Sequence, residues 1–201
     1  DGPVPAILRG RMTSDSRLNA PNVLTLLRIL AVPVVVLILF TPEGREISFA
    51  RSVVAFSLFV VATITDLFDG YIARRYQMVT TLGKLLDPLA DKLLVCAAMI
   101  MLIPPGRVPA WMAVIVVARE IGVTALRGMA STEGVVIAAS KLGKAKTLIL
   151  NIGVAALILH YPVFGIHSDD VGMVFLSAGL VLTAWSGLDY FFRFVGEIFK
   201  R

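Results

Sequence analysis

The amino-acid sequence predicts an all-α integral membrane protein with six transmembrane helices and a polar cavity that faces the cytoplasm. The composition points to a membrane, because 57% of the 201 residues are hydrophobic and only 16% are charged, whereas soluble domains carry roughly 25% charged residues. The mean hydropathy is +0.84. The arrangement points the same way, since the apolar residues fall into six long runs with short polar connections between them.

Each apolar run is long enough to cross a bilayer, which takes roughly 20 residues. The runs start near Asn22, Ile47, Leu85, Pro109, Leu148 and Val171. The predicted connections are residues 42–45, 74–83, 104–107, 131–146 and 161–170, and none has room for a soluble domain. We expect residues 1–20 to be an N-terminal arm, partly interfacial or added to the natural chain, and residues 21–201 to be the transmembrane domain.

Basic residues alternate between the two ends of the predicted helices. One end carries only Arg45, Arg51 and Arg107. By the positive-inside rule, the richer end is cytoplasmic, which places both termini and the active site on the cytoplasmic face of the cell (inner) membrane. The net charge of +5 forms no single patch, so a lipid bilayer is a better anionic partner than nucleic acid. The richer end carries Arg9, Arg11, Arg17, Arg74, Arg75, Lys84, Lys141, Lys144, Lys146, Arg193, Lys200 and Arg201.

Two pairs of aspartates lie where the second apolar run ends and the third begins. Asp66 and Asp69 are spaced i,i+3, and Asp87 and Asp91 are spaced i,i+4, so each pair lies on one face of its helix. Two antiparallel helices joined by a short turn are related by reflection about the midpoint of that turn. We therefore expect Asp69 to face Asp87, with Asp66 facing Asp91 one turn deeper.

Carboxylates that converge in a partly apolar setting repel one another, and each costs on the order of 2.5–3.5 kcal/mol near the centre of a membrane helix. Cations must compensate this charge. Oxygen ligands without cysteine or histidine favour Mg²⁺ or Mn²⁺. The spacing suits two ions about 3.5–4 Å apart, as in phosphoryl transfer. The alternative to a metal site is that the aspartates are surface acids at a helix end. This alternative could explain a single aspartate, but it does not explain four aspartates in mirrored register.

The small residues Gly70, Ala73 and Gly83 keep the surroundings of the aspartates open to a helix or a planar group. With the aspartates and Arg74 they form the motif D-x-x-D-G-x-x-A-R, which is followed after eight residues by G-x-x-x-D-x-x-x-D. This pattern resembles the signature of the CDP-alcohol phosphotransferase family, and the length and six-helix layout fit it from about Pro21 onward. The resemblance implies that an acceptor alcohol displaces CMP from a CDP-linked substrate, with divalent metal, in a membrane domain that forms a homodimer.

The resemblance also implies roles for individual residues. Asp66, Asp69 and Asp87 would bind the metal ions, and Asp91 would act as general base on the acceptor hydroxyl and as a further metal ligand. The implied CDP-lipid site consists of Asn22, Thr25, Asp66, Asp69, Gly70, Ala73, Arg74 and Thr81.

Three further segments bear on the acceptor. Asn22, Thr25 and Arg28 form N-x-x-T-x-x-R on a common helix face, Arg119 is followed by Glu120, and residues 140–147 read SKLGKAKT. These segments resemble those of the bacterial phosphatidylglycerophosphate synthases within the family. The implied reaction joins CDP-diacylglycerol to glycerol 3-phosphate, whose phosphate needs cationic partners of its own. The implied acceptor phosphate site consists of Arg28, Arg119, Arg127, Lys141, Lys144 and Lys146.

Arg119 lies about ten residues into an apolar run, so it must pair either with Glu120 or with substrate.

Other interpretations of the function of the chain stay open. Within the family, the acceptor could be inositol phosphate, phosphatidylglycerol or serine. Outside it, the carboxylates could select ions in a divalent-cation transporter, although all four lie on one predicted hairpin and no second copy is visible.

Overall fold

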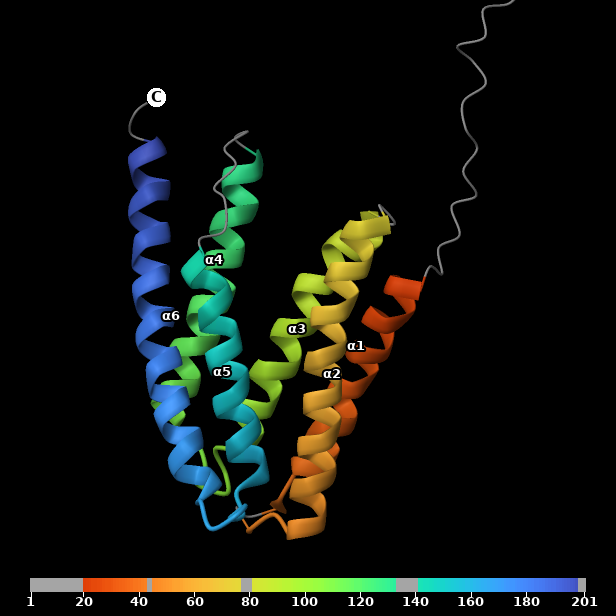
Figure 1. The fold of residues 1–201 in the computed structure, drawn as a ribbon. Coiled ribbons are helices and arrows are strands. Elements are labelled where there is room, and N and C mark those ends of the chain that lie inside the picture. The colour runs from red at the N-terminus through yellow and green to blue at the C-terminus, as the bar shows by residue number, and fades with distance from the viewer. Residues whose placement is uncertain (1–19, 43–44, 77–80, 133–140, 199–201) are drawn as a thin grey trace, which may run out of the picture.

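The computed structural model describes residues 20–42, 45–76, 81–132 and 141–198, and these residues form an all-helical bundle (Figure 1). The predicted all-α class is confirmed for this part of the chain. Its six helices are α1 (Ala20–Leu39), α2 (Phe49–Tyr76), α3 (Thr81–Met101), α4 (Ala110–Thr132), α5 (Lys141–Leu159) and α6 (Ser168–Ile198).

The helices extend further than the apolar runs predict. The expected connection 74–83 is wrong, because α2 continues to Tyr76 and α3 begins at Thr81. The expected connection 131–146 is also too long, since α5 begins at Lys141, and α6 begins at Ser168 within the expected connection 161–170. The reason is that polar and charged residues end an apolar run without ending a helix, since Lys and Arg are good helix formers, as are Leu and Ala. In α6, Asp169 and Asp170 lie in the first turn, where acidic side chains stabilise the start of a helix.

Consecutive helices run in opposite directions, and the bundle consists of two groups of three, α1–α3 and α4–α6 (Figure 1). The start of α1, the joined ends of α2 and α3, and the end of α6 lie at one end of the bundle. The connections that follow α1, α3 and α5 lie at the opposite end. The aspartate positions and the described start and end of the chain therefore share one end.

The core between the helices is apolar and the outer surface is apolar as well. Phe59, Met99 and Leu157 are at most 1% exposed, whereas Leu37 and Val181 point outward with exposures of 73% and 68%. By length and composition, one stretch within the described helices, Ser168–Arg193 in α6, is long and apolar enough to cross a membrane. Shorter apolar stretches are Thr25–Leu39, Phe49–Thr65, Lys92–Met101 and Ala145–Leu159.

Two arginines at the end opposite the aspartates serve the fold. Arg107 is 6% exposed and donates hydrogen bonds to Ser52 Oγ at 3.0 Å, the Ile158 carbonyl at 2.8 Å and the Ile47 carbonyl at 3.1 Å. Arg51 donates to the carbonyls of Ile38 at 2.9 Å and Phe40 at 2.6 Å. Arg51 thus satisfies carbonyls at the C-terminus of α1, and Arg107 satisfies one at the C-terminus of α5 and one just before the start of α2.

A close approach of α5 and α6 depends on two glycines. A Cβ atom at Gly153 would lie 2.7 Å from the backbone nitrogen of Leu176 and 3.1 Å from the Gly172 carbonyl oxygen. Small residues of this kind allow membrane helices to pack backbone to backbone.

We expect Gly153→Ala to destabilise the protein by about 1–3 kcal/mol, because the new methyl group forces the two backbones apart. Unfolding in mixed detergent micelles, followed by far-UV circular dichroism, measures the change. Gly122→Ala in α4 is the matched control, since nothing lies within 4 Å of its added Cβ. Equal unfolding midpoints for the two variants would contradict the tight α5–α6 contact.

Candidate functional site

The four aspartates lie on α2 and α3, close to where these helices are joined (Figure 1). The structure describes their places on the helices, but the side chains of Asp66, Asp69, Asp87 and Asp91 lie outside the described residues. The expected facing pairs therefore stay a prediction. The same holds for the side chains of Asn22 on α1, Gly70, Ala73 and Arg74 on α2, Thr81 on α3, and Lys141 and Lys144 on α5.

Thr25 and Arg28 share the inward face of α1, as expected. They are 1% and 3% exposed. The Nε atom of Arg28 donates to the Ala62 carbonyl of α2 at 3.2 Å. Since Asp66 follows Ala62 by four residues, it lies one turn further along the same face of α2. Arg28 thus packs against the helix that carries Asp66 and Asp69, at the α1–α2 interface.

A cluster of four charged residues joins three helices, and we call it the Glu120 cluster. It consists of Glu120 and Arg119 on α4, Lys92 on α3 and Lys146 on α5. The Glu120 carboxylate lies 2.8 Å from Arg119 Nη1 and 3.5 Å from Lys92 Nζ, and it also pairs with Lys146 Nζ. Three cations and one carboxylate leave a formal charge of +2. The side chains of Lys146, Arg119 and Glu120 are only 4%, 12% and 14% exposed.

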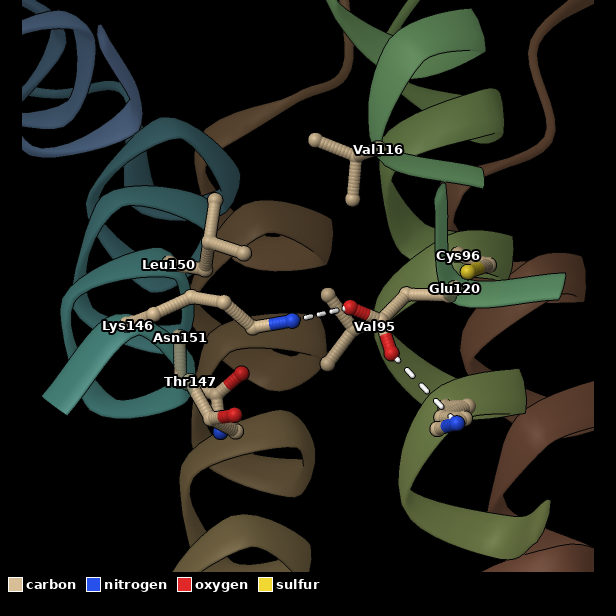
Figure 2. Close-up of a pocket in the computed structure, with 9 residues that line it drawn as sticks. Val95, Cys96, Val116, Glu120, Lys146, Thr147, Leu150 and Asn151 are labelled. Carbon is tan, nitrogen blue, oxygen red and sulfur yellow. Dashed lines mark hydrogen bonds and ion pairs between the residues drawn. The ribbon is translucent and has the colours of Figure 1, made fainter. Parts of the chain in front are cut away.

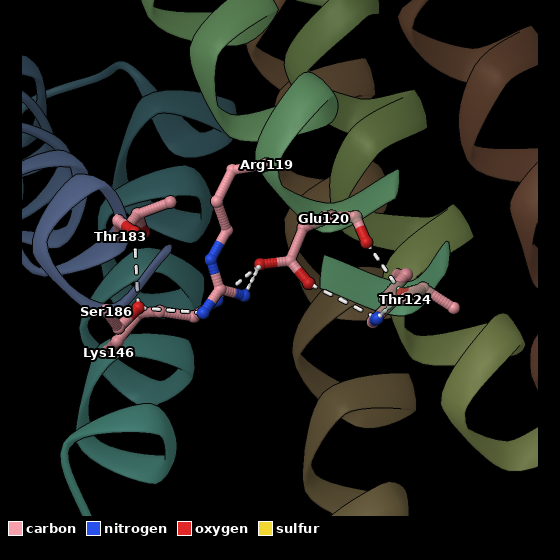
Figure 3. Close-up of polar contacts among 7 residues, drawn as sticks. Arg119, Glu120, Thr124, Lys146, Thr183 and Ser186 are labelled. Atoms are coloured by element: carbon pink, nitrogen blue, oxygen red, sulfur yellow. Dashed lines mark hydrogen bonds and ion pairs between the residues drawn. The ribbon is translucent and has the colours of Figure 1, made fainter. Parts of the chain in front are cut away.

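Neutral side chains give the cluster further support (Figure 3). Arg119 Nη2 donates to Ser186 Oγ of α6 at 2.7 Å, and Ser186 donates in turn to the Thr183 carbonyl at 3.1 Å. Thr124 accepts a hydrogen bond from Lys92 and donates to the Glu120 carbonyl oxygen at 2.6 Å. Each of these contacts crosses between helices or ties a side chain to its own backbone, so the cluster is held from several sides.

A cavity of about 60 Å³ opens beside the cluster (Figure 2). By volume it holds a few water molecules. Lys146 reaches across it from α5 toward Glu120 on α4. The Oδ1 atom of Asn151 is buried in its wall without a hydrogen-bond donor among the described residues. The lining residues are Lys92, Val95, Cys96, Val116, Glu120, Lys146, Thr147, Leu150 and Asn151.

The cavity is close to the aspartates along α3. Val95 lines the cavity, and Asp91 precedes it by four residues, so the two positions lie on one face of the helix, about 6 Å apart along its axis. A polar molecule in the cavity would therefore lie about one helical turn from the position of Asp91. The cations of the cluster can bind an anionic group in the cavity. A hydroxyl group of the same molecule can then donate a hydrogen bond to the side-chain oxygen Oδ1 of Asn151.

The structure brings together two of the predicted acceptor residues, Arg119 and Lys146. It confirms that Arg119 pairs with Glu120, one of the two alternatives. Arg127 is not in the cluster, because its guanidinium lies 5.5 Å over the Tyr190 ring. Lys92, which lies 3.5 Å from the Glu120 carboxylate, was not among the residues that the sequence predicted for the site. The sequence feature that could have indicated Lys92 is its place in an apolar helix directly after Asp91, where a charged side chain needs a partner.

Comparison with known proteins gives one family and several close relatives. Residues 18–185 match the family model described as CDP-alcohol phosphatidyltransferase. A Bacillus subtilis (strain 168) protein named CDP-diacylglycerol–glycerol-3-phosphate 3-phosphatidyltransferase is 41% identical over 180 residues, which cover 86% of this chain and 93% of the relative.

Two further relatives agree with this match. A Mycobacterium tuberculosis (strain H37Rv) protein named probable phosphatidylglycerophosphate synthase is 41% identical over 94% of this chain and 88% of its own length. A Rickettsia typhi protein with the same name as the Bacillus relative is 41% identical over 86% of this chain and 95% of its own length. The residues matched by the family model include both aspartate pairs and the whole Glu120 cluster.

Proposed function

Since the chain belongs to the CDP-alcohol phosphatidyltransferase family, we propose that this enzyme transfers the phosphatidyl group of CDP-diacylglycerol to glycerol 3-phosphate. The products are phosphatidylglycerophosphate and CMP. The observation that carries the choice of acceptor is the Glu120 cluster, whose surplus of positive charge borders a cavity one turn from Asp91. The names of relatives at 41% identity support the same reaction.

The four aspartates fit divalent metal by their chemistry and by their places on α2 and α3. Carboxylates alone favour hard ions, so we propose that Asp66, Asp69, Asp87 and Asp91 hold two Mg²⁺ or Mn²⁺ ions. When bound, such ions would polarise the diphosphate oxygens and stabilise the charge that develops as the bond to CMP breaks. Four carboxylates offset by two divalent ions leave no net charge, which suits the interior of a membrane protein.

The chain's own residues then have three tasks. Asp91 removes the proton from the acceptor hydroxyl, and the oxygen of that hydroxyl forms a bond to the phosphatidyl phosphorus as the bond to CMP breaks. Arg119 and Lys146 hold the acceptor phosphate, and Lys141, Lys144 and Arg127 contribute positive charge toward the same end of the bundle. The CDP-lipid binds along Asn22, Thr25, Gly70, Ala73, Arg74 and Thr81. Arg28, beside the aspartate helix, suits either phosphate group.

We propose that all six helices cross the cell (inner) membrane, with both termini, the polar cavity and the site on the cytoplasmic side. Outward-facing apolar residues on several helices support this, among them Leu37, Ile121, Val174 and Trp185. The richer basic end is also the end that carries the aspartates. The acyl chains then stay in the bilayer while the head group enters between helices, and a homodimer is part of the same proposal.

We expect the purified protein in detergent micelles to release CMP from CDP-diacylglycerol only when both glycerol 3-phosphate and Mg²⁺ or Mn²⁺ are present. Chelation by EDTA should reduce release to background, and readdition of the metal should restore it. Parallel reactions with serine, inositol phosphate and phosphatidylglycerol serve as controls. Release with one of these instead of glycerol 3-phosphate would overturn the acceptor assignment. No metal-dependent release with any acceptor would overturn the proposed reaction as a whole.

A further inference from the structure

Glu120 links three helices through a single carboxylate. Its two oxygens contact Arg119 on its own helix, Lys146 on α5 and Lys92 on α3. The backbone of Glu120 also accepts a hydrogen bond from Thr124, which in turn accepts one from Lys92. The carboxylate is thus the centre of the cluster, and the cations are arranged around it.

Removal of this carboxylate would leave like charges together in a poorly hydrated interior. Lys146 is the most sensitive, because its side chain is 4% exposed and its ammonium group pairs with the Glu120 carboxylate. A buried charge that loses its partner is strongly unfavourable, so the side chain moves or the cluster opens. Arg119 keeps its hydrogen bond to Ser186 but loses the 2.8 Å contact that orients the other side of its guanidinium.

The cluster retains the means to bind a further anion. Its formal charge is +2, and Arg119 Nε is buried without an acceptor among the described residues. Arginine and lysine side chains carry five and three N–H donors, more than one carboxylate can occupy. A doubly charged phosphate therefore complements the cluster without displacing Glu120.

We propose that Glu120 is a positioning residue for the acceptor: its carboxylate holds Lys146, which lines the cavity, and Arg119, which contacts the same carboxylate, so that an incoming phosphate meets a preformed pair of cations. The inference rests on the proposed function, since it concerns binding of glycerol 3-phosphate. Preformed partners reduce the ordering that binding would otherwise require. Loss of Glu120 should therefore weaken the acceptor and leave the CDP-lipid almost unaffected.

The test compares the KM values of the two substrates in Glu120→Gln, which keeps the shape of the side chain and removes its charge. We expect the KM for glycerol 3-phosphate to rise at least about 10-fold, as for the loss of one charge-assisted hydrogen bond, while the KM for CDP-diacylglycerol changes less than about 2-fold. Glu120→Asp keeps the charge and should restore part of the acceptor affinity. Asp189→Asn, which removes an exposed carboxylate from an ion pair with Arg193 on α6, is the matched control.

A second variant keeps the inference testable if Glu120→Gln does not fold. Ser186→Ala removes one hydroxyl that accepts from Arg119 and should raise the KM for glycerol 3-phosphate about 3- to 10-fold by the same mechanism. An unchanged acceptor KM in Glu120→Gln overturns the inference; if that variant does not fold, an unchanged acceptor KM in Ser186→Ala overturns it. A lower acceptor KM in Glu120→Gln overturns it too, because Glu120 would then compete with the phosphate. The two outcomes above concern only the role of Glu120. If the wild-type protein releases no CMP with glycerol 3-phosphate, the proposed function itself fails.

Discussion

Asp91→Asn is expected to slow CMP release at least about 100-fold, the lower end of what a general base contributes. Asparagine has nearly the same shape as aspartate, but its amide cannot accept the proton of the acceptor hydroxyl. The three remaining aspartates still supply carboxylates for divalent metal. We therefore expect CDP-diacylglycerol to bind with nearly unchanged affinity, so that the loss falls on turnover.

The measurement is kcat together with equilibrium binding of CDP-diacylglycerol in the presence of metal. Asp69→Asn is the informative comparison, because loss of a metal ligand should weaken CDP-lipid binding as well as turnover. Asp170→Asn is the control, since Asp170 is exposed on the first turn of α6 at the opposite end of the bundle. If Asp91→Asn weakened CDP-lipid binding as much as Asp69→Asn, the role of Asp91 as base would be rejected.

The sequence predicted the number of helices in the described chain and their order, because hydropathy reports which segments must avoid water. It predicted their ends less well. The helix ends after Arg74 in α2 and from Lys141 in α5 carry charged residues, among them Arg75, Lys141 and Lys144, so a hydropathy argument excluded them. Backbone hydrogen bonds and helix propensity extend the helices past the apolar layer, and neither depends on hydropathy.

The site shows the same division between local and long-range information. The aspartate motif and the Arg119–Glu120 pair lie within short segments, so spacing and the need of a buried charge for a partner could predict them. Lys92 and Lys146 join Glu120 from other helices, 28 and 26 residues away in sequence, and only packing reveals this. Arg127 follows Arg119 by eight residues, which places it about 12 Å along α4 and about 80° around it. It therefore reaches Tyr190 instead of the cluster.

Arg107→Ala is expected to lower the free energy of unfolding by at least about 3 kcal/mol. The substitution leaves the Ile158 and Ile47 carbonyls and the Ser52 hydroxyl without their charged donor, and each lost bond of this kind costs about 1–3 kcal/mol. Burial lowers the pKa of Arg107, an effect that nearby Asp169 opposes, but arginine stays charged at any working pH. The guanidinium thus holds the start of α2 and the end of α5 to the connection between α3 and α4.

Unfolding by SDS in mixed micelles measures the loss. Arg193→Ala is the matched control, because its ion pair with Asp189 is exposed at the surface and such pairs contribute only about 0–1 kcal/mol. Arg107→Lys should lose less than Arg107→Ala, since a lysine can reach one carbonyl but cannot span three acceptors. Below the unfolding transition, the KM for glycerol 3-phosphate should match that of wild type, because Arg107 lies at the end of the bundle opposite the aspartates. A stability within about 0.5 kcal/mol of Arg193→Ala, the range of ordinary surface substitutions, would show that Arg107 does not tie the helices together.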